Sequence, residues 1–241
     1  MQYPKSEAYN TLALQSKIMG PNPIKLTEEL LLRHRIPAGA RVCDLGSGQG
    51  LTSAFLCREY GFQVYAADLW SDPAENRRFF DSLHLPADRI IPVKADATNL
   101  PFEKDFFDAV VSVDSYNYFG RDPDYLDAKL LPFVKEGGYI YIAIPGMKRD
   151  CHDALPACLL LSWTPEQMEY MHDTAYWKKI VGACQGAEVL DVSEMESNAE
   201  VWRDWLTQEN EYAVGDRKAM EAGGGAYLNF IRIVLRKKGR A

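Results

Sequence analysis

The chain has 241 residues, of which 47% are hydrophobic, so it can bury one sizeable core and we expect a single domain over residues 1–241. Asp and Glu number 34 against 27 Lys and Arg, and the net charge of −7 gives no general attraction to nucleic acid or to an anionic membrane. Neither is therefore expected as a partner.

The cysteines and the N-terminus indicate a compartment. The five cysteines form no Cys-x-x-Cys motif and their number is odd, so we predict a reducing compartment, with no zinc or other metal site. The opening sequence MQYPKSEAYN has no apolar signal region, and the longest apolar run is far too short to span a bilayer. We therefore expect a cytoplasmic protein.

Two helices are expected in a cap formed by residues 1–36. They cover residues 6–17 and 24–35, because the sequence GPNP at 20–23 interrupts the helical pattern and Asn22 is a good N-cap. The second helix is expected to pack against the sheet. For four other residues of the cap, lining a ligand site and simple packing are equally good interpretations: Tyr3, Tyr9, Met19 and Gly20.

The most informative stretch is residues 41–51, which read RVCDLGSGQGL. Residues 42–45 are short and mostly apolar, as in a buried parallel strand, and residues 51–60 have the apolar spacing of a helix. Between them, Gly46 and Gly48 permit positive φ and let a ligand approach bare backbone. The start of the helix offers unpaired N–H groups to a polar or anionic group.

A second apolar strand, residues 62–67, ends at Asp68, whose carboxylate is placed to accept hydrogen bonds from ribose hydroxyls. In a dinucleotide-binding turn, G-x-G-x-x-G, the third glycine would stand at position 51. That position is Leu51 here, and the glycine is Gly50. The spacing argues against NAD and towards a different adenosine ligand.

Three further strands are expected before residue 146. Residues 90–95 form the third and end at Asp96. Residues 106–113 are nearly all apolar, so this fourth strand is expected to be central and buried on both faces, with Asp114 following it. Residues 139–144 form the fifth strand.

Taken together, these motifs resemble those of the class I methyltransferases, which use S-adenosylmethionine (SAM). DLGSGQG followed by Asp68 is similar to the first two family motifs, and KADAT at 94–98 is similar to the third. FDAVVSVDSYNYF at 107–119 and KEGGYIYIAIP at 135–145 are similar to the fourth and fifth. All five occur in family order, and the branch looks like the small-molecule and quinone methyltransferases.

The resemblance implies where SAM would bind. Asp68 would contact the ribose, the acidic residue after the third strand the adenine amino group, and Asp114 the methionine end or the methyl acceptor. Leu69 and Trp70 are placed to pack on the adenine, although a Trp near a strand end is often ordinary core. The expected cofactor-binding residues are Asp44, Gly46, Ser47, Gly48, Gly50, Asp68, Leu69, Trp70, Asp96, Ala97 and Asp114.

From residue 147 the pattern changes, and residues 147–176 contain no core strand but are broken by Pro156 and Pro165. We expect a substrate-side insertion here, because loops at the carboxyl ends of parallel strands carry ligand sites.

Three residues are candidate catalytic groups. His152 and His172 are the better general bases by chemistry, although surface histidines are common in insertions. Tyr116, with Tyr118, could line the acceptor site or pack under the cap.

The resemblance implies an α/β fold, a Rossmann-like three-layer sandwich. Its seven-stranded sheet would have the order 3-2-1-4-5-7-6, with an antiparallel last strand over residues 226–237 and a helical cap. It also implies an enzyme that transfers a methyl group from SAM to a small-molecule N, O or C acceptor by in-line displacement, with a homodimer as an option. Two alternatives stay open: a SAM-binding sensor or partner subunit without turnover and, less well supported, an NAD(P)-dependent oxidoreductase.

Overall fold

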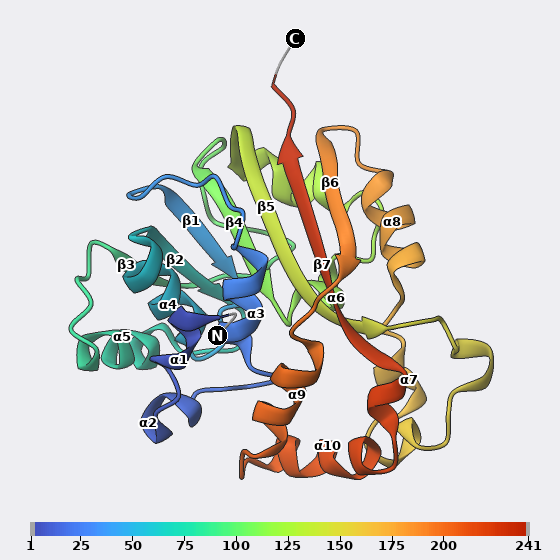
Figure 1. Cartoon of the computed structure of the whole chain (residues 1–241). Helices are drawn as coiled ribbons and strands as arrows, with labels where there is room; N and C mark the ends of the chain where they lie inside the picture. Colours follow the sequence, from blue (N-terminus) through green and yellow to red (C-terminus); the bar gives the residue numbers. More distant parts are fainter. Residues whose placement is uncertain (1–2, 240–241) are drawn as a thin grey trace.

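One mixed sheet forms the centre of the molecule. The structure is a computed structural model that describes residues 3–239. The strands are β1 (Arg41–Leu45), β2 (Gln63–Asp68), β3 (Ile90–Lys94), β4 (Phe107–Val113), β5 (Val134–Met147), β6 (Ala187–Glu194) and β7 (Leu228–Lys237). Their order is β3-β2-β1-β4-β5-β7-β6, and β7 runs antiparallel to both of its neighbours (Figure 1). The predicted strand order and the antiparallel last strand are confirmed.

Helices lie against both faces of the sheet and beyond one end of it. The α-helices are α1 (Pro4–Glu7), α2 (Leu12–Gln15), α3 (Pro23–Leu30), α4 (Leu51–Tyr60), α5 (Pro73–Ser82), α6 (Tyr116–Phe119), α7 (Pro165–Met168), α8 (Thr174–Gly182), α9 (Asn198–Leu206) and α10 (Glu211–Glu221). A π-helix, η1 (Leu126–Leu130), and four 3₁₀ turns complete the set: η2 (Leu131–Phe133), η3 (His152–Ala154), η4 (Leu159–Leu161) and η5 (Gly224–Ala226).

Two buried clusters make this a three-layer sandwich. One joins the sheet to α3, α4, α5 and α9 and includes Phe55, Phe80 and Trp202. The other packs the opposite face against η1 and α8 and includes Leu126 and Trp177. Figure 1 shows α9 and α10 gathered beyond the end of the sheet where the parallel strands stop. Among the described residues, no helix combines the length and apolar character needed to cross a membrane.

The helix α3 packs against the core, as predicted, and it anchors the cap with buried charges. The Asn22 side chain accepts a hydrogen bond from Lys25 N and caps the helix. Glu29, which is 3% exposed, accepts hydrogen bonds from the backbone N–H groups of Glu196 and Ser197, and Glu28 accepts two from Lys5 and Ser6. These acids are buried because each serves backbone donors from a separate segment.

Three predicted element boundaries are wrong. The second helix, expected over residues 24–35, is α3, which ends at Leu30. The continuous helix expected over residues 6–17 is two short helices, α1 and α2, separated at residues 8–11. The break buries Tyr9, whose ring packs edge-on against Phe55 of α4 at 5.0 Å between centroids. The fifth strand, expected over residues 139–144, extends at both ends because β7 pairs along it from Tyr139 to Met147.

Candidate functional site

The glycine turn between β1 and α4 has the backbone that the sequence predicts. Gly46, Gly48 and Gly50 have φ values of 79°, 51° and 83°. A Cβ atom on Gly46 would collide with the Ser115 side chain, and one on Gly50 would lie 2.6 Å from the Phe80 ring. Glycine is therefore required here both for its conformation and for the close approach of neighbouring side chains.

Asp68 is fixed beside this turn. Its Oδ2 atom accepts a hydrogen bond from Gly48 N at 2.9 Å, and its Oδ1 atom accepts from Trp70 N at 2.8 Å and Ser71 N at 2.7 Å. A carboxylate has about four acceptor positions, so capacity remains for a ligand hydroxyl. Leu69 and Trp70 are 42% and 87% exposed, so Trp70 is not a core residue and both side chains are open to a ligand.

Two predicted cofactor residues next to the turn differ in what they can contact. Asp44 lies beneath the turn, 1% exposed, and its Oδ2 atom accepts a hydrogen bond from Ser53 Oγ of α4 at 2.5 Å. Burial raises the pKa of Asp44 to about 7. The Ser47 hydroxyl is also buried and has no hydrogen-bond partner in the described part of the chain. Asp44 thus joins β1 to α4, whereas Ser47 has a free hydroxyl to offer a ligand.

The loop after β3 is held by its own hydrogen bonds. Asp96 Oδ1 accepts from Thr98 N at 2.8 Å and from Thr98 Oγ1 at 2.7 Å, and these bonds hold the pKa of Asp96 below its ordinary value. The carbonyl of Ala97 accepts a hydrogen bond from the Tyr125 hydroxyl at 2.9 Å. The second carboxylate oxygen of Asp96 has no hydrogen bond within residues 3–239, and the side chain is exposed, so it can accept from a ligand amino group.

A cavity of about 90 Å³ lies between the glycine turn and the segment that joins α2 to α3. The Met19 side chain covers the turn, and its Sδ atom accepts a hydrogen bond from Gln49 Nε2 at 2.9 Å. Pockets for small-molecule ligands usually measure about 300–1,000 Å³, so this segment fills much of the space that such a ligand needs. The cavity lining is Lys17, Met19, Gly20, Pro23, Gly46, Ser47, Gly48, Gln49, Leu51, Thr52, Val113 and Asp114.

A larger hollow of about 630 Å³ lies elsewhere, between α3 and the face formed by β5, β6 and β7. Its lining includes Arg33, Tyr139 and Arg232 but none of the predicted cofactor residues. The smaller cavity at the glycine turn is therefore the candidate functional site.

Asp114 marks the far end of this cavity. Its φ of 56° is unusual for a residue other than glycine, and its backbone N–H donates to the Ala143 carbonyl at 2.8 Å. Its carboxylate lies so close to Gly20 that a Cβ atom there would collide with it. Burial and then the negative charge of Asp216 raise the pKa of Asp114 to about 7.

Asp216 is a residue of this site that sequence reasoning missed. It lies on α10, which brings its charge near Asp114, and its Oδ2 atom accepts a hydrogen bond from Trp205 Nε1 at 2.8 Å. Burial also raises the pKa of Asp216. No local motif marks this aspartate, because it lies on a helix far along the chain from Asp114, and only the fold brings the charge of Asp216 near Asp114.

The three predicted catalytic residues lie apart from the cavity. Tyr116 is fully buried, with its ring against Tyr125 and Trp177, and burial raises its pKa well above the ordinary value. This placement gives no support to a catalytic Tyr116. His152 and His172 do come together, with ring centroids 4.8 Å apart, but neither lines the cavity.

Residues 43–142 match the protein family described as "Methyltransferase domain". This part of the chain therefore resembles a methyltransferase domain, and its sheet has the strand order of the class I methyltransferase fold. The match runs from β1 into β5 and contains the glycine turn, Asp68, Asp96 and Asp114, within a sheet that has the strand order of this class. SAM is the cofactor of this domain.

Comparisons with known proteins agree with this assignment. Demethylmenaquinone methyltransferase of Clavibacter sepedonicus is 39% identical over 107 residues, which are 44% of this chain and 41% of that protein. Methyltransferase GfsG of Streptomyces halstedii is 30% identical over 119 residues, 49% of this chain and 42% of that protein. The matched regions thus cover less than half of either curated relative.

A solved structure supports the fold over nearly the whole chain. Phosphoethanolamine N-methyltransferase 2 of Haemonchus contortus, solved in complex with SAM, superposes with a TM-score of 0.73 at 18% identity. The similarity covers 97% of this chain and 59% of that one.

The chemistry of the residues around the turn suits SAM, although the cavity there is small. The glycines leave the backbone bare, the Ser47 hydroxyl lacks a partner among residues 3–239, and the Asp68 carboxylate faces the turn beside an exposed Trp70. The residues around the turn can therefore hold the nucleoside of SAM and its methionine end without a rearrangement of the sheet.

Replacement of Asp68 by alanine is expected to weaken SAM binding at least tenfold. Hydrogen bonds to a charged group are each worth about 1.5–3 kcal/mol, and about 1.4 kcal/mol is a tenfold change in affinity. Calorimetry on the folded variant measures the effect, with Asp88→Ala, an exposed carboxylate after α5, as the matched control. A change within about twofold would place the ribose away from Asp68.

Replacement of Asp44 by asparagine is expected to reduce the loss of stability as pH rises. A carboxyl with a raised folded pKa stabilises the fold fully below its unfolded pKa of about 3.9, and this stability is lost as pH rises through the folded value of about 7. Urea unfolding at pH 4 and pH 8 should show a smaller loss in Asp44→Asn than in the wild type, by up to about 4 kcal/mol at 1.36 kcal/mol per pKa unit. Equal losses in both proteins would mean that Asp44 is ionised in the fold.

Proposed function

We propose that the chain is an enzyme that transfers the methyl group of SAM to a small-molecule N, O or C acceptor by in-line displacement. The observation that carries the proposal is the methyltransferase-domain match over residues 43–142, which falls on a structurally intact glycine turn with Asp68 beside it. We also propose a cytoplasmic location, which is in keeping with five free cysteine thiols.

The proposed arrangement places the nucleoside of SAM over the carboxyl ends of β1, β2 and β3. Asp68 accepts from the ribose, Asp96 from the adenine amino group, and the exposed Leu69 and Trp70 side chains cover the adenine. Ser47 and the first N–H groups of α4 are left for the methionine end, since Gly50 caps this helix without a side chain.

When bound, SAM supplies a methyl group already activated by the positive charge on its sulfur. The protein then needs chiefly to align the acceptor and to exclude water. Asp114 and Asp216 lie where β4 ends, and the pKa of Asp114, raised to about 7, suits a group that accepts a proton near neutral pH. We propose that this pair, rather than Tyr116, faces the acceptor, with the exposed ring of Tyr118 at its edge.

A turnover assay tests the proposed function. The purified chain, incubated with methyl-labelled SAM and a metabolite extract, is expected to form S-adenosylhomocysteine together with a labelled product. Asp114→Asn should slow this turnover by a larger factor than it weakens SAM binding, because the carboxyl would act on the acceptor. SAM binding without turnover in any extract would favour the sensor or partner subunit, and binding of NADH but not SAM would favour the oxidoreductase.

Residues 3–20 and 147–176 are proposed to form a lid that orders when cofactor binds. Met19 and Gly20 already line the cavity, and the insertion holds α10 through Ser162, whose Oγ atom donates to the Gly215 carbonyl at 2.7 Å. Hydrogen exchange with and without S-adenosylhomocysteine is expected to show new protection in both segments as well as around the glycine turn. Protection confined to residues 46–50 would show that both segments are static scaffold.

A further inference from the structure

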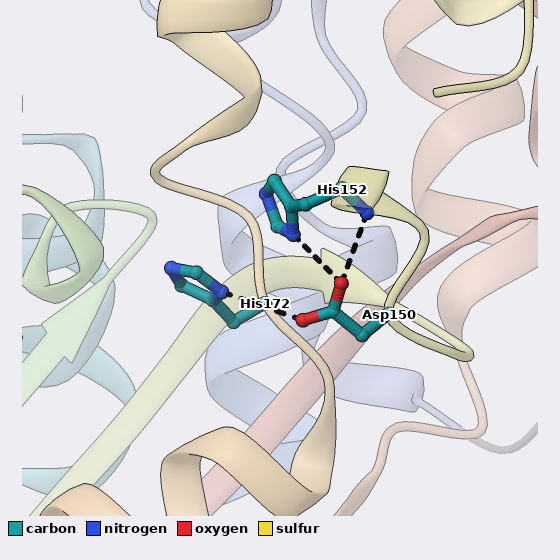
Figure 2. Close-up of side chains that lie close together, drawn as sticks. All are labelled: Asp150, His152 and His172. Atoms are coloured by element: carbon teal, nitrogen blue, oxygen red, sulfur yellow. Dashed lines mark hydrogen bonds and ion pairs between the residues drawn. The ribbon is translucent and has the colours of Figure 1, made fainter. Parts of the chain in front are cut away.

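Three side chains from the two ends of the insertion converge on one point. Asp150 and His152 follow the end of β5, and His172 lies just before the start of α8. One ligand atom from each residue lies within 4.8 Å of those of the others. Figure 2 shows a ring nitrogen of each histidine directed towards the Asp150 carboxylate.

The hydrogen bonds of His152 require a positive charge between this ring and Asp150. His152 Nε2 lies 3.0 Å from the Met168 carbonyl, which can only accept, so Nε2 carries a hydrogen. In a neutral ring Nδ1 then presents a lone pair, yet it lies 2.9 Å from Asp150 Oδ1, which is also an acceptor. Either a proton or a metal ion must bridge them. In a metal-bound histidine, the ring nitrogen that does not bind the metal usually donates a hydrogen bond, often to a backbone carbonyl.

His172 supplies a second, independent observation. The residue is 9% exposed, and its Nδ1 atom has no hydrogen-bond partner among the described residues. This nitrogen lies 3.9 Å from Asp150 Oδ2, too far for a hydrogen bond, while the ring is held by stacking on Tyr176 at 3.6 Å. A buried polar atom without a partner is costly, and a cation shared with Asp150 would satisfy it.

We propose that Asp150, His152 and His172 bind one divalent first-row transition-metal ion, of which Zn²⁺ is the probe. Two imidazoles and a carboxylate suit such an ion. Zinc–ligand distances of about 2.0–2.2 Å set tetrahedral donors about 3.3 Å apart, and the observed 2.9 and 3.9 Å separations lie on either side of this value. The Asp150 side chain is 47% exposed, which gives the ion a path of entry and leaves room for water ligands.

Two other charged residues of opposite sign lie near the histidines of this cluster. Glu169 adds a negative charge near both histidines, whereas Arg121 adds a positive charge near His172. Cysteine spacing predicts no metal site in this chain, and it does not reveal this cluster, because the two histidines are separated by most of the insertion. An ion at this position would link the end of β5 to the start of α8 and so hold the two ends of the insertion together. This proposal does not depend on methyl transfer.

Zinc titration of the full chain, freed of metal by a chelator and without SAM, tests the proposal. Calorimetry is expected to show one zinc ion per chain, and Zn²⁺ should raise the melting temperature. Asp150→Asn and His152→Gln should each weaken binding at least tenfold and abolish the thermal shift. The matched control is Asp153→Asn, which removes an exposed carboxylate from the same turn and should bind as the wild type does.

Either of two other results of the zinc titration would overturn the proposal. Absence of zinc binding by the wild type would leave the three residues as a hydrogen-bonded cluster that contains a protonated His152. Equal binding by the wild type and by both variants would place the ion elsewhere. Circular dichroism establishes that the variants fold, which the partial exposure of Asp150 and His152 favours.

Discussion

The carboxyl end of β1 can accommodate its neighbours only because Gly46 has no side chain. Ser115, from the loop after β4, occupies the space that a Cβ atom would take, and its Oγ atom donates to the Leu45 carbonyl at 2.9 Å. On the other side, Asp68 at the end of β2 accepts from Gly48. One turn thereby fixes the ends of three adjacent strands, and the candidate site is built from the residues that follow those ends.

Buried acids give this site its electrostatic character. Asp114 follows the end of β4 and is affected by the negative charge of Asp216 on α10, and neither acid has a cationic side chain bonded to it in the described structure. A positive charge in the cavity would favour their ionised forms, and ionisation would in turn favour the cation. If the sulfonium of SAM binds here, its affinity and the protonation of these acids are coupled, which links cofactor binding to the state of the group nearest the acceptor.

The sequence predicts this fold well where local pattern and chemistry agree. The glycine turn, Asp68 and the apolar strands are short-range signals, and the family motifs supply the strand order. The N-terminal helix fails because burial of Tyr9 against α4 overrides a helical pattern. The sequence left Tyr116 either at the acceptor site or packed under the cap, because its position after β4 does not reveal that its ring packs against Trp177 of α8.

What the sequence could not reveal depends on contacts between distant segments. Asp216 joins the site only through the docking of α10, and His152 meets His172 only because the insertion returns to its starting point. Trp70 is a different case, since the sequence allowed both a core and a ligand-facing side chain, and its exposure excludes the core. Local spacing therefore locates the cofactor motifs but not the side chains that the cap and insertion contribute.

The position of β7 between β5 and β6 has a consequence for how the chain is made. β6 pairs only with β7 in the described sheet, and β7 is synthesised after it. During translation the first five strands can assemble in their parallel order, whereas β6 must wait, without a partner along either edge, until residues 228–237 have emerged from the ribosome. Three acidic side chains, Glu188, Asp191 and Glu194, keep that unpaired strand from being a uniformly apolar surface on which nascent chains could associate.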